Sequence, residues 1–177
     1  MGKIKDPSSV KLIAGFIFRD EGLFAEASAC LRRRFGKTDF ESPALTFNYT
    51  DYYEKEFGTG LIRRFLGFEK PIDPGIIAEI KIFTNKVEDK FARRGCRRIN
   101  IDPGYVDLSK LILATTKDYS HRIYLKKGIY AETTLIYQGK SFRECPWTYP
   151  DYRTPEYIGI FNRIRNNYAL QTEKRRG

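Results

Sequence analysis

The sequence predicts one α+β domain in which strands and helices alternate as βαββαβ, followed by an extension of short strands and a final helix. Three observations predict this class. Residues 10–18 form a nearly continuous apolar run, which is typical of a strand buried on both faces. Two later segments carry apolar residues at helical spacing. The 177 residues, of which 41% are hydrophobic, suffice for one buried core and are few for two.

The first elements follow from local signals. After the strand at 10–18, Asp20 is placed to cap a helix and Gly36 to end it. The buried stripe of this helix consists of Leu23, Phe24, Ala27, Leu31 and Phe35. Residues 44–49 and 61–69 are two further predicted strands.

A second helix begins at Asp73 and Pro74, a cap followed by a proline in the first turn, and is expected to stop at Gly95. Its buried stripe consists of Ile76, Ile80, Phe83, Val87 and Phe91. Residues 98–101 form a fourth strand with Ile99 and Ile101 inward. This order is the ferredoxin-like plan, two helices on one face of an antiparallel sheet, and we assign it to residues 1–105.

Residues 106–177 form the extension. Asp107 is expected to cap a short helix through Ala114, and strands are expected at 121–125 and 129–137. A final helix opens at Pro155, and its core stripe is Tyr157, Phe161, Ile164 and Tyr168. Because no linker or repeat divides the chain, a single compact domain is expected over 1–177, with the extension packed on the core.

Charge and cysteine content limit the function classes. The net charge of +10, from 32 basic and 22 acidic residues, favours an anionic partner, although it also suits a solubilising surface. Cys30, Cys96 and Cys145 are odd in number and widely spaced, which predicts neither a disulfide framework nor a zinc site. With no signal-peptide core and no apolar run long enough to span a bilayer, a cytoplasmic protein without membrane contact is expected.

Three short segments, residues 48–54, 115–122 and 147–153, are dense in aromatic and polar side chains. Each contains an Asp-Tyr pair, and together they hold the only tryptophan and the only histidine. Such a mixture suits a recognition pocket, and it equally suits solvated loops that cover the core. Because side chains alternate along a strand, Asn100 and Asp102 lie opposite Ile99 and Ile101. We expect the three segments to meet around one cleft near Asn100 and Asp102.

Several motifs occur together in one order, at residues 10–13, 49–53, 63–65, 100–105, 113–118 and 147–152. On these motifs the chain resembles a small bacterial and archaeal family of conserved domains of unknown function, over nearly its whole length. Some members of that family are loosely labelled GTP-binding protein. The resemblance implies a single domain and names no reaction.

The GTP label can be tested on residues 104–111, which have the expected strand–loop–helix context of a phosphate-binding P-loop. Ser109 stands where the second glycine is needed, and Leu111 stands where a hydroxyl would hold magnesium. A capped short helix after a turn at Pro103-Gly104 explains the segment better than a GTPase site does.

Three functions remain open from the sequence. The first is a cytoplasmic protein that binds a phosphate-bearing ligand, RNA or nucleotide, through arginine and lysine on phosphate and aromatic stacking. Its ligand-binding candidates are Asp51, Tyr52, Tyr53, Arg63, Arg64, Asn100, Lys117, Tyr119, Arg122, Trp147, Asp151 and Tyr152.

The second function is a hydrolase or transferase for a phosphorylated substrate, in which Asp102, Asp118 and His121 do acid–base or metal-assisted work. The third is a non-catalytic assembly subunit, such as a homodimer, whose final helix docks a partner. Asp51, Glu69 and Asp102 are oxygen donors of the kind magnesium prefers, but their spacing does not require a metal, and no cofactor is indicated.

Overall fold

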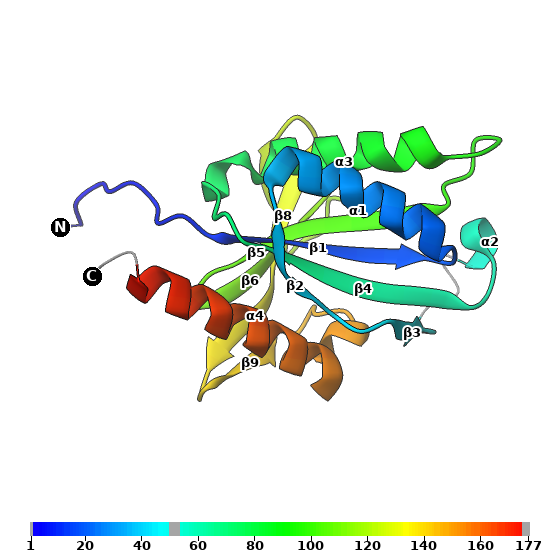
Figure 1. Ribbon diagram of the computed structural model, residues 1–177. Helices are drawn as coiled ribbons and strands as arrows, with labels where there is room; N and C mark the ends of the chain where they lie inside the picture. The colour runs from blue at the N-terminus through cyan, green and yellow to red at the C-terminus, as the bar shows by residue number, and fades with distance from the viewer. Residues whose placement is uncertain (1, 50–53, 175–177) are drawn as a thin grey trace.

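The computed structural model describes residues 2–49 and 54–174, and at Glu54 and Lys55 only the backbone. It is a mixed α+β structure built on a large antiparallel sheet (Figure 1). The strand order is β2-β4-β1-β5-β6-β8-β7, with β3 paired to β4 and β9 paired to β8. The strands are β1 (Lys11–Phe18), β2 (Thr38–Glu41), β3 (Leu45–Phe47), β4 (Leu61–Phe68), β5 (Ile99–Val106), β6 (Lys110–Thr115), β7 (Ile123–Lys126), β8 (Ile129–Gln138) and β9 (Ser141–Glu144).

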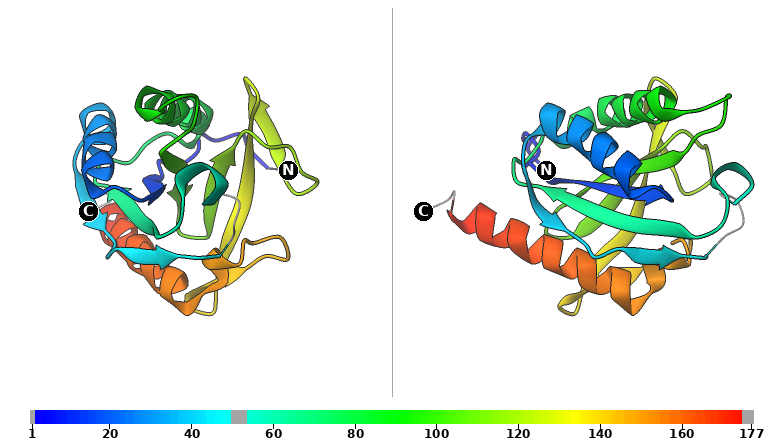
Figure 2. Two further views of the ribbon diagram at one scale, coloured as in Figure 1. Left: turned by 90° about the vertical axis from the view of Figure 1, so that its right-hand side faces the viewer. Right: turned by 45° about the vertical axis from the view of Figure 1, so that its right-hand side comes forward.

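Helices cover both faces of this sheet. Figures 1 and 2 show α1 (Glu21–Phe35) and α3 (Ile77–Phe91) together on one face and α4 (Pro155–Lys174) on the other. All eight residues of β1 are buried because β1 lies between β4 and β5 and is covered on both faces. One apolar cluster lies under α1 and α3, and a second lies under α4. Within the described residues, no helix is long and apolar enough to cross a lipid bilayer.

The predicted caps and stripes of the helices are confirmed in most details. Asp20 Oδ1 accepts a hydrogen bond from the Leu23 amide at 3.1 Å, and Gly36 ends α1 with φ of 95°. The α4 stripe of Tyr157, Phe161, Ile164 and Tyr168 is buried. Asp73 caps a 3₁₀ turn, Pro74–Ile76, which leads into α3. Ile76 itself is exposed, so the buried stripe of α3 is shorter than predicted.

The helix predicted from Asp107 to Ala114 is wrong. The Asp107 carboxylate instead caps a tight turn, because Oδ1 accepts from the amides of Ser109 at 2.7 Å and Lys110 at 2.8 Å. The chain then returns as β6, which pairs with β5. The P-loop context predicted for residues 104–111 is therefore also wrong, since a strand follows the turn where a phosphate-binding helix would be needed.

The turn predicted at Pro103-Gly104 is wrong as well, because β5 continues through both residues to Val106. Gly104 serves a close approach of two strands: an added Cβ would lie 2.2 Å from the Ile112 carbonyl oxygen. The strand predicted at 44–49 is shorter, as β3, and β2 precedes it. The helix α3 ends at Phe91, and Gly95 with φ of 78° lies in the turn that pairs Arg93 with Cys96.

Candidate functional site

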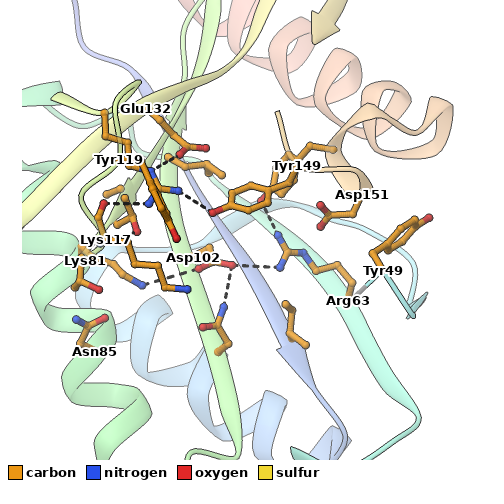
Figure 3. A pocket seen from close by; sticks show the side chains of 18 of the residues that line it. Tyr49, Arg63, Lys81, Asn85, Asp102, Lys117, Tyr119, Glu132, Tyr149 and Asp151 are labelled. Carbon is orange, nitrogen blue, oxygen red and sulfur yellow. Dashed lines mark hydrogen bonds and ion pairs between the residues drawn. The ribbon is translucent and has the colours of Figure 1, made fainter. Parts of the chain in front are cut away.

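A cavity of about 840 Å³ opens beside β5, between α3 and the loops that follow β6 and β9 (Figure 3). The polar-aromatic segments contribute Tyr49 from the first, Lys117, Tyr119, His121 and Arg122 from the second, and Trp147, Tyr149, Asp151 and Tyr152 from the third. Strands supply Arg63, Asn100 and Asp102, and α3 supplies Lys81, Asn85, Glu88 and Asp89. Segments far apart in the sequence thus line one hollow.

The floor of the cavity is organised around the Asp102 carboxylate. Arg63 Nη1 donates to Asp102 Oδ2 at 3.3 Å, and Asn100 Nδ2 donates to the same oxygen at 2.9 Å. The Lys81 amine lies 4.0 Å from the other oxygen. Figure 3 shows Lys81 and Lys117 directed toward Asp102 from one side and Arg63 from the other. Asp102 therefore sits among cations, where its negative charge is compensated.

Arg63 is the buried member of this group, with 1% of its side chain exposed. Its Nη2 donates to the Tyr152 hydroxyl at 2.5 Å, and its guanidinium lies 4.8 Å from the centre of the Phe65 ring. Burial favours the neutral guanidine, yet the neighbours Tyr152, Asp102 and Asp151 outweigh burial and raise the pKa of Arg63. Arg63 is thus a fixed positive charge beneath the cavity.

Two buried carboxyls in the cavity have raised pKa values. Burial raises the pKa of Asp151, and Arg63 only partly opposes that effect. Burial likewise raises the pKa of Glu88, against the attraction of Lys81. The Glu88 carboxylate accepts from the Ile101 amide at 2.7 Å. A raised pKa is one of the marks of a carboxyl that takes part in proton transfer.

A second polar group closes the other side of the cavity. Arg122 Nε donates to Glu132 Oε2 at 2.6 Å, and both side chains are 2% exposed. The same guanidinium donates to the Lys117 carbonyl at 3.0 Å and to the Tyr149 hydroxyl at 2.7 Å. Arg122 thus fixes two loop segments of the cavity wall to the sheet strand β8.

The rim carries an aromatic stack. The ring centroids of Tyr119 and His121 are 6.1 Å apart, and those of His121 and Trp147 are 5.4 Å apart, with interplanar angles of 7° and 11°. Trp147 Nε1 donates to the Thr133 carbonyl at 2.8 Å, which fixes the indole on β8. Tyr119 and Trp147 are exposed, and the Arg122 guanidinium lies 4.6 Å from the centre of the Tyr119 ring.

The structure brings together ten of the sequence-predicted site residues: Arg63, Asn100, Asp102, Lys117, Tyr119, His121, Arg122, Trp147, Asp151 and Tyr152. It does not place Arg64 or Asp118 in the cavity lining. Arg64 binds Glu21 at 3.1 Å and Glu41 at 3.0 Å on the α1 side of the sheet, because adjacent residues of a strand face opposite ways. The candidates Asp51, Tyr52 and Tyr53 lie outside the described residues.

Sequence reasoning missed the contribution of α3. Lys81, Asn85 and Glu88 recur at i, i+4 and i+7, which places them on one helical face, and all three line the cavity. This spacing of polar residues, next to the apolar stripe of the same helix, was the signal in the sequence that could have revealed their place in the site. Arg97 and Glu132 carried no comparable signal, since their partners Glu56 and Arg122 come from other segments.

The lining has balanced charge. Its described residues include five cations and five carboxylates: Arg63, Lys81, Arg97, Lys117 and Arg122, and Glu88, Asp89, Asp102, Glu132 and Asp151. Among the residues that the structure describes, no group of three or more His, Cys, Asp or Glu side chains is arranged to hold a metal ion. The cavity therefore offers many directional polar contacts and no strong net field.

Comparison with known proteins gives a family and no activity. No match to this chain is found among curated proteins or solved structures. The family model described as a domain of unknown function (DUF4416) matches residues 8–168, a range that includes every residue lining the cavity. Since the match covers most of the chain, the protein belongs to the DUF4416 family of domains of unknown function.

Proposed function

We propose that the protein binds a phosphate-bearing ligand of nucleotide size in this cavity. The observation that carries the proposal is the approach of Arg63, Lys81 and Lys117 to one region beside Asp102, with an aromatic rim on the same hollow. A volume of about 840 Å³ lies within the range of roughly 300–1,000 Å³ that is usual for small-molecule sites. Ammonium groups bind phosphate oxygens, and exposed rings stack on bases.

The proposal favours a nucleotide over RNA. With five cations and five carboxylates in the lining, binding would depend on directional hydrogen bonds and stacking more than on a long-range field. The Asp102 carboxylate accepts hydrogen bonds and the Asn100 amide both donates and accepts them, as the recognition of ribose hydroxyls or base edges requires. RNA binding would instead rely on counterion release and would weaken steeply with salt.

The only tryptophan, Trp147, is 40% exposed on the rim, so its fluorescence reports occupancy of the cavity. We would titrate the protein with ATP, GTP, CTP and UTP, the corresponding nucleosides, inorganic phosphate and an unstructured RNA oligomer. GTP is included because of the label carried by some family members. A saturable change is expected with at least one nucleotide and a weaker one with its nucleoside. No change with any nucleotide at low salt would refute the proposal, and salt-sensitive binding of RNA alone would replace the nucleotide with RNA.

Lys117→Ala provides the site-specific test, and Lys70→Ala is the matched control on an exposed residue outside the cavity. A charge-assisted hydrogen bond contributes about 1.5–3 kcal/mol, so Lys117→Ala is expected to weaken nucleotide binding about tenfold or more. Lys70→Ala is expected to leave the affinity unchanged. Equal affinities for the two variants would show that ligand binds elsewhere.

A hydrolase or transferase acting on a phosphorylated substrate is the second candidate, and the buried Asp151 favours it. Burial raises the pKa of Asp151, which suits general acid–base catalysis, and Asp102 and His121 line the same cavity. Asp118 is left out of this scheme because it is not in the lining. Turnover of a bound nucleotide that is lost in Asp151→Asn, with binding retained, would support the enzyme; binding without turnover would exclude it.

We also propose a ferredoxin-like core and a cytoplasmic location. The order β2-β4-β1-β5, antiparallel throughout, with α1 and α3 on one face, supports a ferredoxin-like core in residues 1–105. Three free thiols support a cytoplasmic location. The assembly-subunit hypothesis relied on α4 as a docking helix, and the apolar stripe of α4 packs on the protein's own sheet.

A further inference from the structure

A groove runs between α1 and α3 on the outer face of the helical layer, away from the cavity. It encloses about 420 Å³ and is lined by Cys30, Arg33 and Arg34 of α1 and by Phe83, Lys86, Val87 and Lys90 of α3. The two helices lie side by side (Figure 2), and the ring centroids of Phe35 and Phe83 are 5.4 Å apart. The groove shares no lining residue with the cavity.

The charge of this groove is one-sided. Four of its seven lining residues, Arg33, Arg34, Lys86 and Lys90, are cations with exposed side chains, and none is acidic. Within the described part of the chain, none of the four forms an ion pair with a carboxylate. This contrasts with the cavity, where cations and carboxylates balance. Uncompensated like charges on facing helices repel each other and favour an anionic partner.

The floor of the groove is apolar. Val87 is buried, and Cys30 and Phe83 are partly buried side chains packed against the core cluster under α1 and α3. Lys86 and Lys90 are four residues apart on α3, so they lie one turn apart along one wall. Arg33 and Arg34 form the opposite wall on α1. An apolar strip with two cations on each side is the complement of an amphipathic segment with acidic flanks.

We propose that this groove binds an acidic amphipathic helix of a partner protein, with apolar side chains on the floor and carboxylates against the two cations on each side. Helix-in-groove recognition uses apolar anchors at i, i+3, i+4 and i+7, which matches the two-turn length from Phe83 to Lys90. Nucleic acid is disfavoured as the ligand, because proteins that bind single strands stack the bases on exposed aromatic rings. The aromatic residue among those that line the groove, Phe83, is only partly exposed.

The test uses a synthetic fluorescent peptide with leucine at i, i+3, i+4 and i+7 and glutamate on both flanks, and a scrambled peptide of the same composition. Binding is measured by fluorescence anisotropy, with an unstructured RNA oligomer as a competing probe. The groove variant is Arg34→Glu/Lys90→Glu. The control variant is Lys70→Glu/Arg143→Glu, which makes the same charge change at exposed residues outside the groove. Circular dichroism verifies that both variants fold.

The patterned peptide is expected to bind at least tenfold more tightly than the scrambled peptide. The groove variant is expected to lose at least tenfold in affinity, and the control variant less than threefold. Three outcomes would overturn the proposal: no binding of the patterned peptide at low salt, equal loss in the two variants, or RNA binding that is tighter than peptide binding and lost only in the groove variant. The last outcome would assign the groove to nucleic acid.

Discussion

The buried pair Arg122–Glu132 allows a quantitative prediction. Glu132→Gln keeps the shape and one acceptor of the side chain but removes its charge. Arg122 would then be a buried cation without a counter-ion, since both side chains are 2% exposed in the folded protein. Its contacts with the Lys117 carbonyl and the Tyr149 hydroxyl are neutral and would remain.

The magnitude follows from the pair's geometry. At 2.6 Å between Nε and Oε2, the attraction is about 6 kcal/mol for an effective dielectric constant near 20. Breaking a buried pair by removing one partner costs about 3–5 kcal/mol. Because Arg122 retains two neutral partners, we expect the lower end, about 3 kcal/mol. For a chain of this length that lowers the melting temperature by roughly 6–12 °C.

Urea unfolding followed by circular dichroism at neutral pH measures the change in the free energy of unfolding. Glu21→Gln is the control: its side chain is 52% exposed in the pair with Arg64, and such pairs contribute about 0–1 kcal/mol. The double variant Arg122→Met/Glu132→Leu removes both charges and is expected to recover most of the lost stability. If Glu132→Gln destabilises the protein no more than Glu21→Gln does, the pair does not behave as a buried ion pair and the reasoning fails.

Three further predictions concern the cavity and the sheet. Asp102→Asn should weaken nucleotide binding at least tenfold in fluorescence titrations. It should lower the free energy of unfolding in urea by less than about 2 kcal/mol, because the Asp102 side chain is 28% exposed and the amide oxygen still accepts hydrogen bonds. A large loss of stability with unchanged binding would contradict a role of Asp102 in the site. Burial raises the pKa of Asp151, so the cost of ionising it in the folded protein is absent below its ordinary pKa near 4 and grows until the pH passes the raised pKa. Asp151→Asn should therefore gain stability relative to wild type as the pH rises from about 4. A constant difference between the two unfolding curves over that range would refute this. Gly104→Ala should lower the free energy of unfolding by about 1–3 kcal/mol, because its Cβ would lie 2.2 Å from the Ile112 carbonyl oxygen. Gly159→Ala, where α4 leaves open space for a Cβ, should raise it by roughly 0.5–1 kcal/mol. Similar thermal shifts for both variants would rule out the close approach of the two strands at Gly104.

Local signals were sufficient wherever one segment determines its own structure. The apolar run of β1, the Asp20 cap and Gly36 stop of α1, and the Tyr157 stripe of α4 were all predicted and observed. Each depends on neighbours within about one or two helical turns, or on burial of the whole segment. The strand alternation that places Asn100 and Asp102 on the face opposite Ile99 and Ile101 belongs to the same class.

Other features were decided by tertiary contacts. The segment after Asp107 has both a helix cap and an apolar sequence, and pairing of β6 with β5 and β8 selected the strand. Arg63 and Arg64 are adjacent and chemically identical, yet only the fold places one beneath the cavity and the other against Glu21 and Glu41. Periodicity places residues on faces of one element, but it contains no information about which distant element faces them. The composition of the site could therefore be determined only from the tertiary structure, because the partner of Asp102, Arg63, lies on another strand, 39 residues earlier in the chain.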